Sequence, residues 1–337
     1  MNDFTDLIDL TAEQLGGAVV AANDEFFAPK EAMLKSTPAE WREGVYTERG
    51  KWMDGWETRR RREPGHDWAI IRLGVPGVVR GVVIDTSFFR GNYPEQASID
   101  ACAVPGSPPA DELINAPWFE LLPKVALTGD TRNEFPVESD ARVTHLKLNI
   151  YPDGGVARFR AFGDVRSDER SLEGDAVDLA AMENGGYVLL CSDMFFGHRQ
   201  NLILPGRSTH MGNGWETKRR RGPGHDWTIV RLATRGIIHR IELDTDHYKG
   251  NAPAACNVDT CDADASQSFD ATSEVWLETL PRTPLQPHTR HVFDTLVRAP
   301  ATHARLNIYP DGGVARLRLI GRAVDASVPR VRLKESQ

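Results

Sequence analysis

The stretch DGWETRRRREPGHDW occupies residues 54–68, and the chain repeats it as NGWETKRRRGPGHDW at residues 213–227. The two copies lie 159 residues apart and share 12 of their 15 residues. This spacing and identity indicate that the 337-residue chain contains two related structural units. The internal repeat therefore decides the architecture before any single element is considered.

The repeat extends outward from this block in both directions. On the N-terminal side, Asp24–Phe27 matches Asp193–Phe196 at a spacing of 169, so the first unit has ten extra residues before Asp54, most simply a surface loop. On the C-terminal side, the closing blocks at residues 144–160 and 302–318 share 14 of 17 residues. The sequence predicts a first repeat at residues 1–163, a linker at 164–177, a second repeat at 178–325 and a tail at 326–337.

The hydrophobic pattern predicts β-structure in both units. Short runs rich in Val, Ile, Phe and Trp are bounded by Gly, Pro and Asp, which favours strands, with short helices near residues 11–15 and 180–184. The strands expected in the first unit cover residues 68–73, 78–85, 97–103, 119–125, 143–151 and 156–162. An all-β fold of two antiparallel sandwiches fits this spacing better than a parallel α/β sheet.

The closing block predicts a hairpin that turns at residues 152–155. Such a hairpin has Leu148, Ile150, Ala157 and Phe159 on a buried face. Its other face carries polar side chains that recur in the second unit, and we predict that they contact a ligand: Asn149, Tyr151 and Arg158, with Asn307, Tyr309 and Arg316. A solvated face with incidental identity is the alternative interpretation.

Composition limits the functional classes. A net charge of −8 argues against nucleic-acid binding by bulk electrostatics, although the clustered arginines suit a local anion site. No apolar run approaches the roughly 20 residues that span a bilayer, and the N-terminus lacks the basic start of a secretory signal, so a cytoplasmic location is expected. The four cysteines show no metal-binding spacing and are expected to be reduced thiols.

Catalytic residue types recur inside the repeated block. The arginine run suits a substrate carboxylate, and Arg60 and Arg61, with Arg219 and Arg220, are its predicted binding residues. A histidine beside acids suits proton transfer near neutral pH. The predicted catalytic residues are His66, Asp67 and Glu57, with His225, Asp226 and Glu216; adjacent His and Asp side chains on an extended chain point to opposite faces. Solvated arginines and structural histidines are the competing interpretations.

The blocks GWETRRRR, PGHDW, DTSFFRGN followed by Pro94, and the twice-used LNIYPDGGVAR together resemble the allantoicase family over nearly the whole chain. The resemblance implies two tandem jelly-roll sandwiches of the galactose-binding-like type, and a reaction that converts allantoate and water to ureidoglycolate and urea. Apart from the resemblance, Trp56 adds an aromatic wall beside Glu57, so Trp56 and Trp215 are predicted substrate-binding residues; Asn92 and Asn251 meet the demand of allantoate for groups that bind N–H. His247-Tyr248 in place of Phe88-Phe89, and Asn213 in place of Asp54, leave open whether one or both units are active.

Two other functions remain open at this stage. One is a non-catalytic double sandwich that binds a small anion or a carbohydrate. The other is a metal-dependent hydrolase of another ureido compound. No cofactor is expected, with a divalent metal ion at Glu57, His66 and Asp67 as the alternative. The expected partners are allantoate and, through exposed sheet edges, further copies of the chain, with neither nucleic acid nor a membrane.

Overall fold

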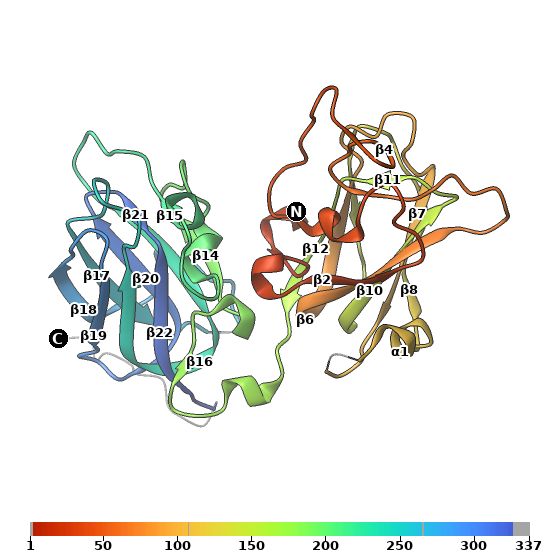
Figure 1. Ribbon diagram of the computed structural model, residues 1–337. Helices are drawn as coiled ribbons and strands as arrows, with labels where there is room; N and C mark the ends of the chain where they lie inside the picture. Colours follow the sequence, from red (N-terminus) through yellow and green to blue (C-terminus); the bar gives the residue numbers. More distant parts are fainter. Residues whose placement is uncertain (1–2, 107, 265, 326–337) are drawn as a thin grey trace. The chain divides into compact units, whose positions relative to one another are not determined.

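The computed structural model describes residues 3–106, 108–264 and 266–325, so the predicted tail at 326–337 lies outside the described residues. The chain forms two compact units, Met1–Arg166 and Ser167–Gln337. Each contains an eight-stranded antiparallel system, shown in Figure 1. The predicted all-β fold of two tandem sandwiches is therefore confirmed, while the exact ends of the predicted linker stay a prediction.

The longest strand organises the first unit. Strand β6 (Asp67–Asp85) pairs through its first part with β2 (Ala18–Ala22) and β10 (Arg142–Tyr151). Its second part pairs with β9 (Arg132–Pro136) and β12 (Arg158–Val165). Strands β7 (Gln96–Cys102) and β8 (Phe119–Ala126) extend the sheet beyond β10, and β1 (Ile8–Asp9) adds to β12. One strand thus belongs to both layers of the sandwich.

The second unit repeats this arrangement. Its long strand β16 (Asp226–Asp244) pairs with β14 (Tyr187–Cys191) and β20 (Pro300–Tyr309) in its first part. It pairs with β19 (Arg290–Asp294) and β22 (Arg316–Ala323) in its second part. The remaining strands are β13 (Val177–Asp178), β17 (Ala255–Cys261) and β18 (Leu277–Pro284). The repeat in sequence is thus a repeat in topology.

The predicted hairpin at residues 152–155 is wrong. Strands β10 and β12 do not pair with each other, because β6 lies between them in the strand order. The expected strands at 68–73 and 78–85 are one continuous strand, β6, and the expected helices are single 3₁₀ turns at Glu13–Leu15 and Met182–Asn184. The predicted burial is nevertheless confirmed: Leu148, Ile150, Ala157 and Phe159 are all 0% exposed.

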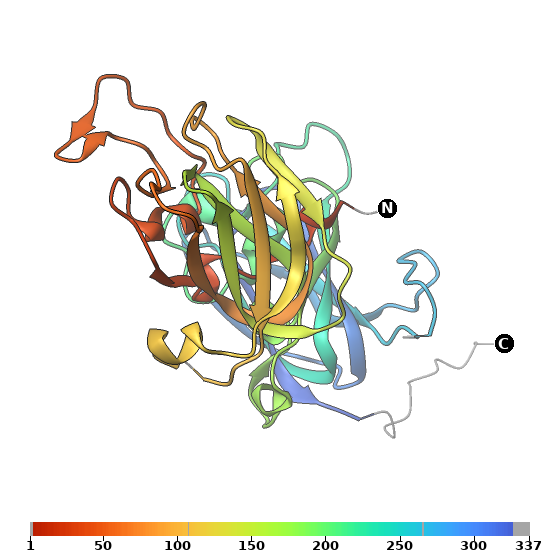
Figure 2. The same cartoon turned by 90° about the vertical axis from the view of Figure 1, so that its right-hand side faces the viewer.

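Short elements at the sandwich ends carry the repeated block. Strand β5 (Trp56–Glu57) pairs with β11 (Gly155–Val156), and β15 (Trp215–Glu216) pairs with β21 (Gly313–Val314). The extra residues of the first unit form a ribbon of β3 (Tyr46–Thr47) and β4 (Gly50–Lys51), which projects from that unit in Figure 2. The only α-helix of the described segments is α1 (Ala110–Ile114).

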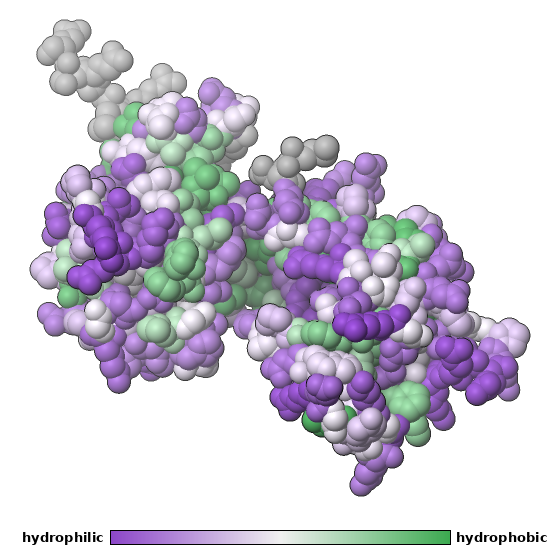
Figure 3. Space-filling view, turned by 90° about the horizontal axis from the view of Figure 1, so that it is seen from above, coloured by the Kyte–Doolittle hydropathy of each residue, from purple (hydrophilic) through white to green (hydrophobic). Residues whose placement is uncertain are grey.

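The surface is largely hydrophilic, with separate small apolar areas on each unit in the view of Figure 3. All four cysteines are free, as predicted, and burial raises the pKa of the Cys102 thiol to about 11. Among the described residues, none of the helices has the length and apolar character required to cross a membrane.

Candidate functional site

Glu57 and Asn92 meet at the wall of a cavity in the first unit. Glu57 is 9% exposed, and Nδ2 of Asn92 donates a hydrogen bond of 2.6 Å to its Oε1. Burial raises the pKa of the Glu57 carboxyl, while the hydrogen bond from Asn92 acts in the opposite direction. A raised pKa favours the protonated form, from which a carboxyl group can donate a proton to a substrate.

Local backbone contacts fix both residues. Glu57 pairs with Gly155 across β5 and β11, and the Gly155 N–H donates to the carbonyl of Asn92 at 2.7 Å. Gly154 has a φ of +141°, and a Cβ there would lie 2.6 Å from the nitrogen of Pro94. Only glycine permits this close approach, so the repeated Gly-Gly of the closing block holds the Asn92 loop against β5.

The cavity has a volume of about 480 Å³ and combines charged, amide and aromatic groups. Its positive charges are Lys51, whose Nζ lies 4.1 Å from the Trp41 ring centroid, and Arg90, which pairs with Asp130 at 3.0 Å. The Trp41 and Phe88 rings lie 5.9 Å apart. The full lining is Phe27, Trp41, Lys51, Met53, Glu57, Phe88, Arg90, Gly91 and Asn92. Such a site can accept a small anion that also carries hydrogen-bonding groups.

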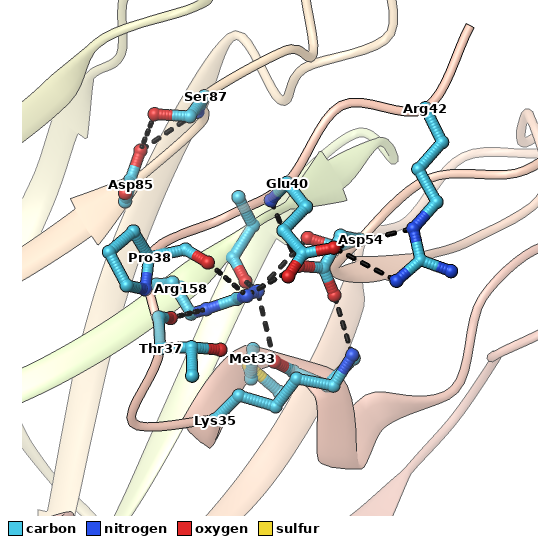
Figure 4. A network of polar contacts seen from close by, with 12 residues as sticks. Met33, Lys35, Thr37, Pro38, Glu40, Arg42, Asp54, Asp85, Ser87 and Arg158 are labelled. Atoms are coloured by element: carbon cyan, nitrogen blue, oxygen red, sulfur yellow. Dashed lines mark hydrogen bonds and ion pairs between the residues drawn. The ribbon is translucent and has the colours of Figure 1, made fainter.

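Arg158 does not line this cavity, which corrects the prediction that it binds substrate. Its side chain is 4% exposed, and Nη2 donates to Asp54 Oδ2 at 2.5 Å and to the Pro38 carbonyl at 3.1 Å. Nε donates to the carbonyl of Thr37 at 2.8 Å. Figure 4 shows the guanidinium enclosed by this segment and by Asp54. Arg158 therefore anchors the chain that leads to Trp41, and its role is to position the cavity wall.

Arg316 occupies the equivalent place in the second unit, again away from a ligand-accessible surface. It is 4% exposed and donates through Nη2 to Asn213 Oδ1 at 2.6 Å. Because Asn213 carries no charge, burial dominates and lowers the pKa of Arg316 to about 10. The polar face predicted for the closing block is thus divided: its Asn and Tyr lie on β10 and β20, whereas its arginines are buried anchors.

The second unit keeps the acid and amide pair. Glu216 is 9% exposed, Nδ2 of Asn251 donates to its Oε1 at 2.5 Å, and burial raises the pKa of Glu216. The chain is ten residues shorter before Asn213, and residues 197–213, all of which the structure describes, contain no counterpart of the β3–β4 ribbon. Trp56 and Trp215, predicted to bind substrate, are 0% exposed and donate through Nε1 to main-chain carbonyls at 2.8 Å, so they support the short strands instead.

Asp67 lies away from the cavity lining. It is 1% exposed, and Arg61 and Asn23 donate to its Oδ1 at 2.6 and 2.8 Å. Arg60 is exposed and borders a separate depression of about 530 Å³ with its arginine neighbours. The second unit repeats this pattern: Arg220 and Ser192 bond Asp226, and Arg219 is exposed.

The predicted histidines occupy another surface. The His66 ring lies 4.8 Å from the Tyr151 ring, and Nδ2 of Asn149 donates to Asp100 Oδ2 at 2.9 Å. His225, Asn307 and Tyr309 form the equivalent group, which lines a cavity of about 710 Å³ in the second unit. Burial lowers the pKa of His66, which favours its neutral form. The structure thus separates the predicted site residues into several groups, of which Glu57 and Asn92 share the first-unit cavity.

Sequence reasoning missed the other residues of that cavity, among them its aromatic and cationic side chains Trp41, Lys51, Phe88 and Arg90. Trp41 and Lys51 lie in the segment without a counterpart, so the repeat could not point to them. Arg90 could have been found from the repeat, because Lys249 keeps a positive charge at the matching position. Within the described segments, no three His, Cys, Asp or Glu side chains are arranged to hold a metal ion.

Comparisons with known proteins agree with the repeat. The allantoicase repeat matches residues 8–166 and 177–324. A probable allantoicase of Pseudomonas aeruginosa is 50% identical over 323 residues, which cover 94% of this chain and 96% of that protein. One of Nocardia farcinica is 50% identical over 321 residues, with 94% and 95% covered. The crystal structure of allantoicase from Saccharomyces cerevisiae has 36% identity and a TM-score of 0.78, covering 93% of this chain and 92% of that one. The chain therefore belongs to the allantoicase family.

Proposed function

We propose that this protein is a hydrolase that converts allantoate and water to ureidoglycolate and urea, a step of allantoin and purine breakdown. The similarity to allantoicases over nearly the full length supports the reaction. Within the structure, one observation carries the location of the site: a buried carboxyl with a raised pKa, Glu57, shares a cavity with two cationic side chains.

The substrate matches the groups that line this cavity. Allantoate has one carboxylate and two planar ureido arms on a single carbon. Lys51 and Arg90 supply positive charge for the carboxylate. The Asn92 amide and the Glu57 carboxyl offer hydrogen-bonding groups to a ureido arm. Trp41 and Phe88 provide flat apolar surfaces that limit access of water.

The products identify the bond that breaks. Because urea leaves intact, cleavage occurs between the central carbon and a ureido nitrogen. Protonated Glu57 donates its proton to the departing nitrogen, and the nitrogen lone pair of the remaining arm stabilises the cationic carbon. Water then adds to this carbon and returns a proton to the Glu57 carboxylate. The cycle consumes one water molecule and regenerates the acid.

Glu57 fits the role of general acid better than the other predicted residues. Asp67 lines the separate depression of the arginine run, where Arg61 holds it, and does not line the cavity of Glu57. His66 lies on another surface, beside the Tyr151 ring, and does not line the cavity of Glu57. His66, His225, Asp67 and Asp226 therefore act, in this proposal, outside the proton-transfer step.

The test measures urea released from allantoate by the purified chain. Glu57→Gln should lower kcat by about 10²–10⁴-fold, because it removes the transferable proton while keeping the shape. Glu216→Gln is the matched control, since it makes the same change in the unit that lacks the ribbon, and it should retain activity. Equal losses in both variants would contradict the assignment to the first unit.

Absence of urea from the unaltered protein, with or without added divalent ions, would reject the reaction itself. That result would favour the non-catalytic binding protein. A cytoplasmic location and self-association stay predictions from the sequence.

A further inference from the structure

We infer that the second unit carries its own binding site for a small carboxylate that bears a planar ureido or amide group. The site is a polar sheet face, here called the His225 platform, made of His225, Trp227, Asn257, Asp259, Arg305, Asn307 and Tyr309. These residues line the cavity of about 710 Å³. The residues of the platform indicate the class of ligand. The further statement that this ligand is the substrate or the product rests on the proposed function.

Strand register brings the platform together. Strand β20 lies between β16 and β17 (Figure 1). Asn307 pairs with Trp227 on one side and with Asn257 on the other, and Arg305 pairs with Ile229 and Asp259. Because side chains two residues apart point to the same face of a strand, two adjacent rows of the sheet converge on one surface.

A hydrogen-bond network fixes these side chains before any ligand arrives. Asp259 accepts from Nδ2 of Asn257 and of Asn307, both at 3.0 Å, and from Nη2 of Arg305 at 2.9 Å. Tyr309 donates to Asn257 Oδ1 at 2.7 Å. Asn257 and Asn307 are only 8% and 4% exposed. Fixed polar groups in a partly buried cavity lose little conformational entropy on binding, which favours recognition of a small ligand.

The histidine completes an acceptor for N–H groups. Its Nε2 lies 3.1 Å from Asn307 Oδ1, and the amide of Asn307 is oriented by Asp259. When Nε2 carries the proton and donates to this oxygen, the neutral ring offers Nδ1 as an acceptor. A ureido or amide N–H is a suitable donor to that atom.

Positive charge is retained on this face in both units although the residues differ. The Arg282 guanidinium lies 3.9 Å from the Tyr309 ring centroid, and Lys124 lies 3.7 Å from Tyr151 in the first unit. Arg305 likewise corresponds to Lys147. Lys124 and Arg282 lie in segments that otherwise share almost no sequence, so retention of the charge points to an anionic ligand.

An aromatic wall borders this face, in which Trp227 and Trp276 have the counterparts Trp68 and Trp118 and Phe269 is particular to the second unit. The segment between β17 and β18 contributes Phe269 and residues 270–272 to the cavity, and Trp276 packs beneath Arg305 at 4.5 Å. Phe269 and Trp227 offer flat faces on which a planar group can stack. Carboxylate recognition by arginine and stacking of a planar amide together define the ligand class.

The experiment titrates the full chain with N-carbamoylglycine, a carboxylate with one ureido group. Calorimetry should show that both the unaltered protein and Glu57→Gln bind this probe. Arg305→Ala should weaken the affinity at least about tenfold, because it removes the contact between the arginine and the carboxylate of the probe. Arg305→Lys should keep most of the affinity, as Lys147 stands at the equivalent position. The indole N–H signals of Trp227 and Trp276 should shift on binding.

Controls separate this inference from misfolding and from the proposed reaction. Asn257→Ser places in the second unit the residue that the first unit has at the equivalent position, Ser98. Thermal unfolding of each variant checks that it is folded. Identical titrations of Arg305→Ala and the unaltered protein, or no binding at millimolar probe, would overturn the inference. Binding as expected in a protein that releases no urea from allantoate would reject the reaction and leave the binding site standing.

Discussion

Asn92 donates its Nδ2 proton to Oε1 of Glu57 across 2.6 Å, and this bond favours the charged form of a carboxyl whose pKa burial raises. A general acid must be protonated, so kcat should fall as pH rises through the pKa of Glu57. Asn92→Ala removes a contact that lowers this pKa and should move the alkaline limb of the kcat profile to higher pH. The pH dependence of urea release measures the shift, and Asn251→Ala in the second unit should leave the profile unchanged.

Trp41→Ala should move the alkaline limb of the kcat profile to lower pH, in the direction opposite to that of Asn92→Ala. Trp41 forms part of the cavity wall, and its removal admits water to Glu57. Because desolvation is the cause that raises the pKa of Glu57, hydration should lower it, and activity should decline at lower pH than in the unaltered protein. Shifts of Asn92→Ala and Trp41→Ala in the same direction would contradict the assignment of Glu57 as the titrating acid.

Lys51→Met should weaken substrate binding more than the chemical step. Lys51 lines the cavity, and in the proposed function its ammonium neutralises the carboxylate of allantoate. Loss of a charged hydrogen bond should raise KM by about 10–100-fold with a smaller change in kcat. Steady-state kinetics separates the two parameters. Lys218→Met, which removes an exposed lysine that pairs with Asp193, serves as the control and should leave KM near its original value.

Asp54→Asn should destabilise the first unit at neutral pH. Burial alone would raise the pKa of Asp54, but hydrogen bonds from Arg158, Lys35 and the Glu40 amide outweigh it, so the pKa is lowered. A lowered pKa contributes stability above the ordinary value of 3.8, and this contribution is lost as pH falls through the folded-state pKa. We expect a loss of about 1–3 kcal/mol in the free energy of unfolding at pH 7.

Hydrogen exchange of the first-unit amides, followed against pH, measures this loss. The difference between Asp54→Asn and the unaltered protein should disappear below the folded-state pKa of Asp54. The second unit supplies the reverse change, since Asn213→Asp places a carboxylate beside Arg316 and should stabilise that unit. A loss that persists at low pH would show that shape, and not charge, makes Asp54 important.

The repeat made much of the molecule predictable. Identity between the two copies located Glu57 and Asn92, and alternation of apolar residues predicted the buried side chains of β10 and β12. The connectivity could not be derived in this way. Pro76 and Gly77 looked like a break between two strands, yet β6 continues through them and changes partners from β10 to β12. Without that pairing, β10 and β12 seemed to be neighbours.

The same limitation explains the arginines. The alternation of polar and apolar residues correctly predicts that Arg158 and Asn149 lie on the face opposite the apolar core. It does not show whether that face contacts solvent, a ligand or another part of the chain. Here the segment that follows the 3₁₀ turn lies over the arginine in both units: Nε of Arg158 donates to the Thr37 carbonyl, and Nε of Arg316 donates to the Gly206 carbonyl. Lys51 and Trp41 were outside the reach of the repeat, because a segment present once has no second copy for comparison.

The insertion begins after a 3₁₀ turn, Lys30–Leu34, that recurs as Arg199–Ile203, and it ends where Asp54 and Asn213 correspond. Its attachment points therefore exist in both halves of the chain. In evolutionary terms, placing Trp41 and Lys51 near the acid required only the gain or loss of one loop on a duplicated scaffold. A loop with matching ends can also be transferred, and grafting it onto the second half offers a route to a protein with two such cavities.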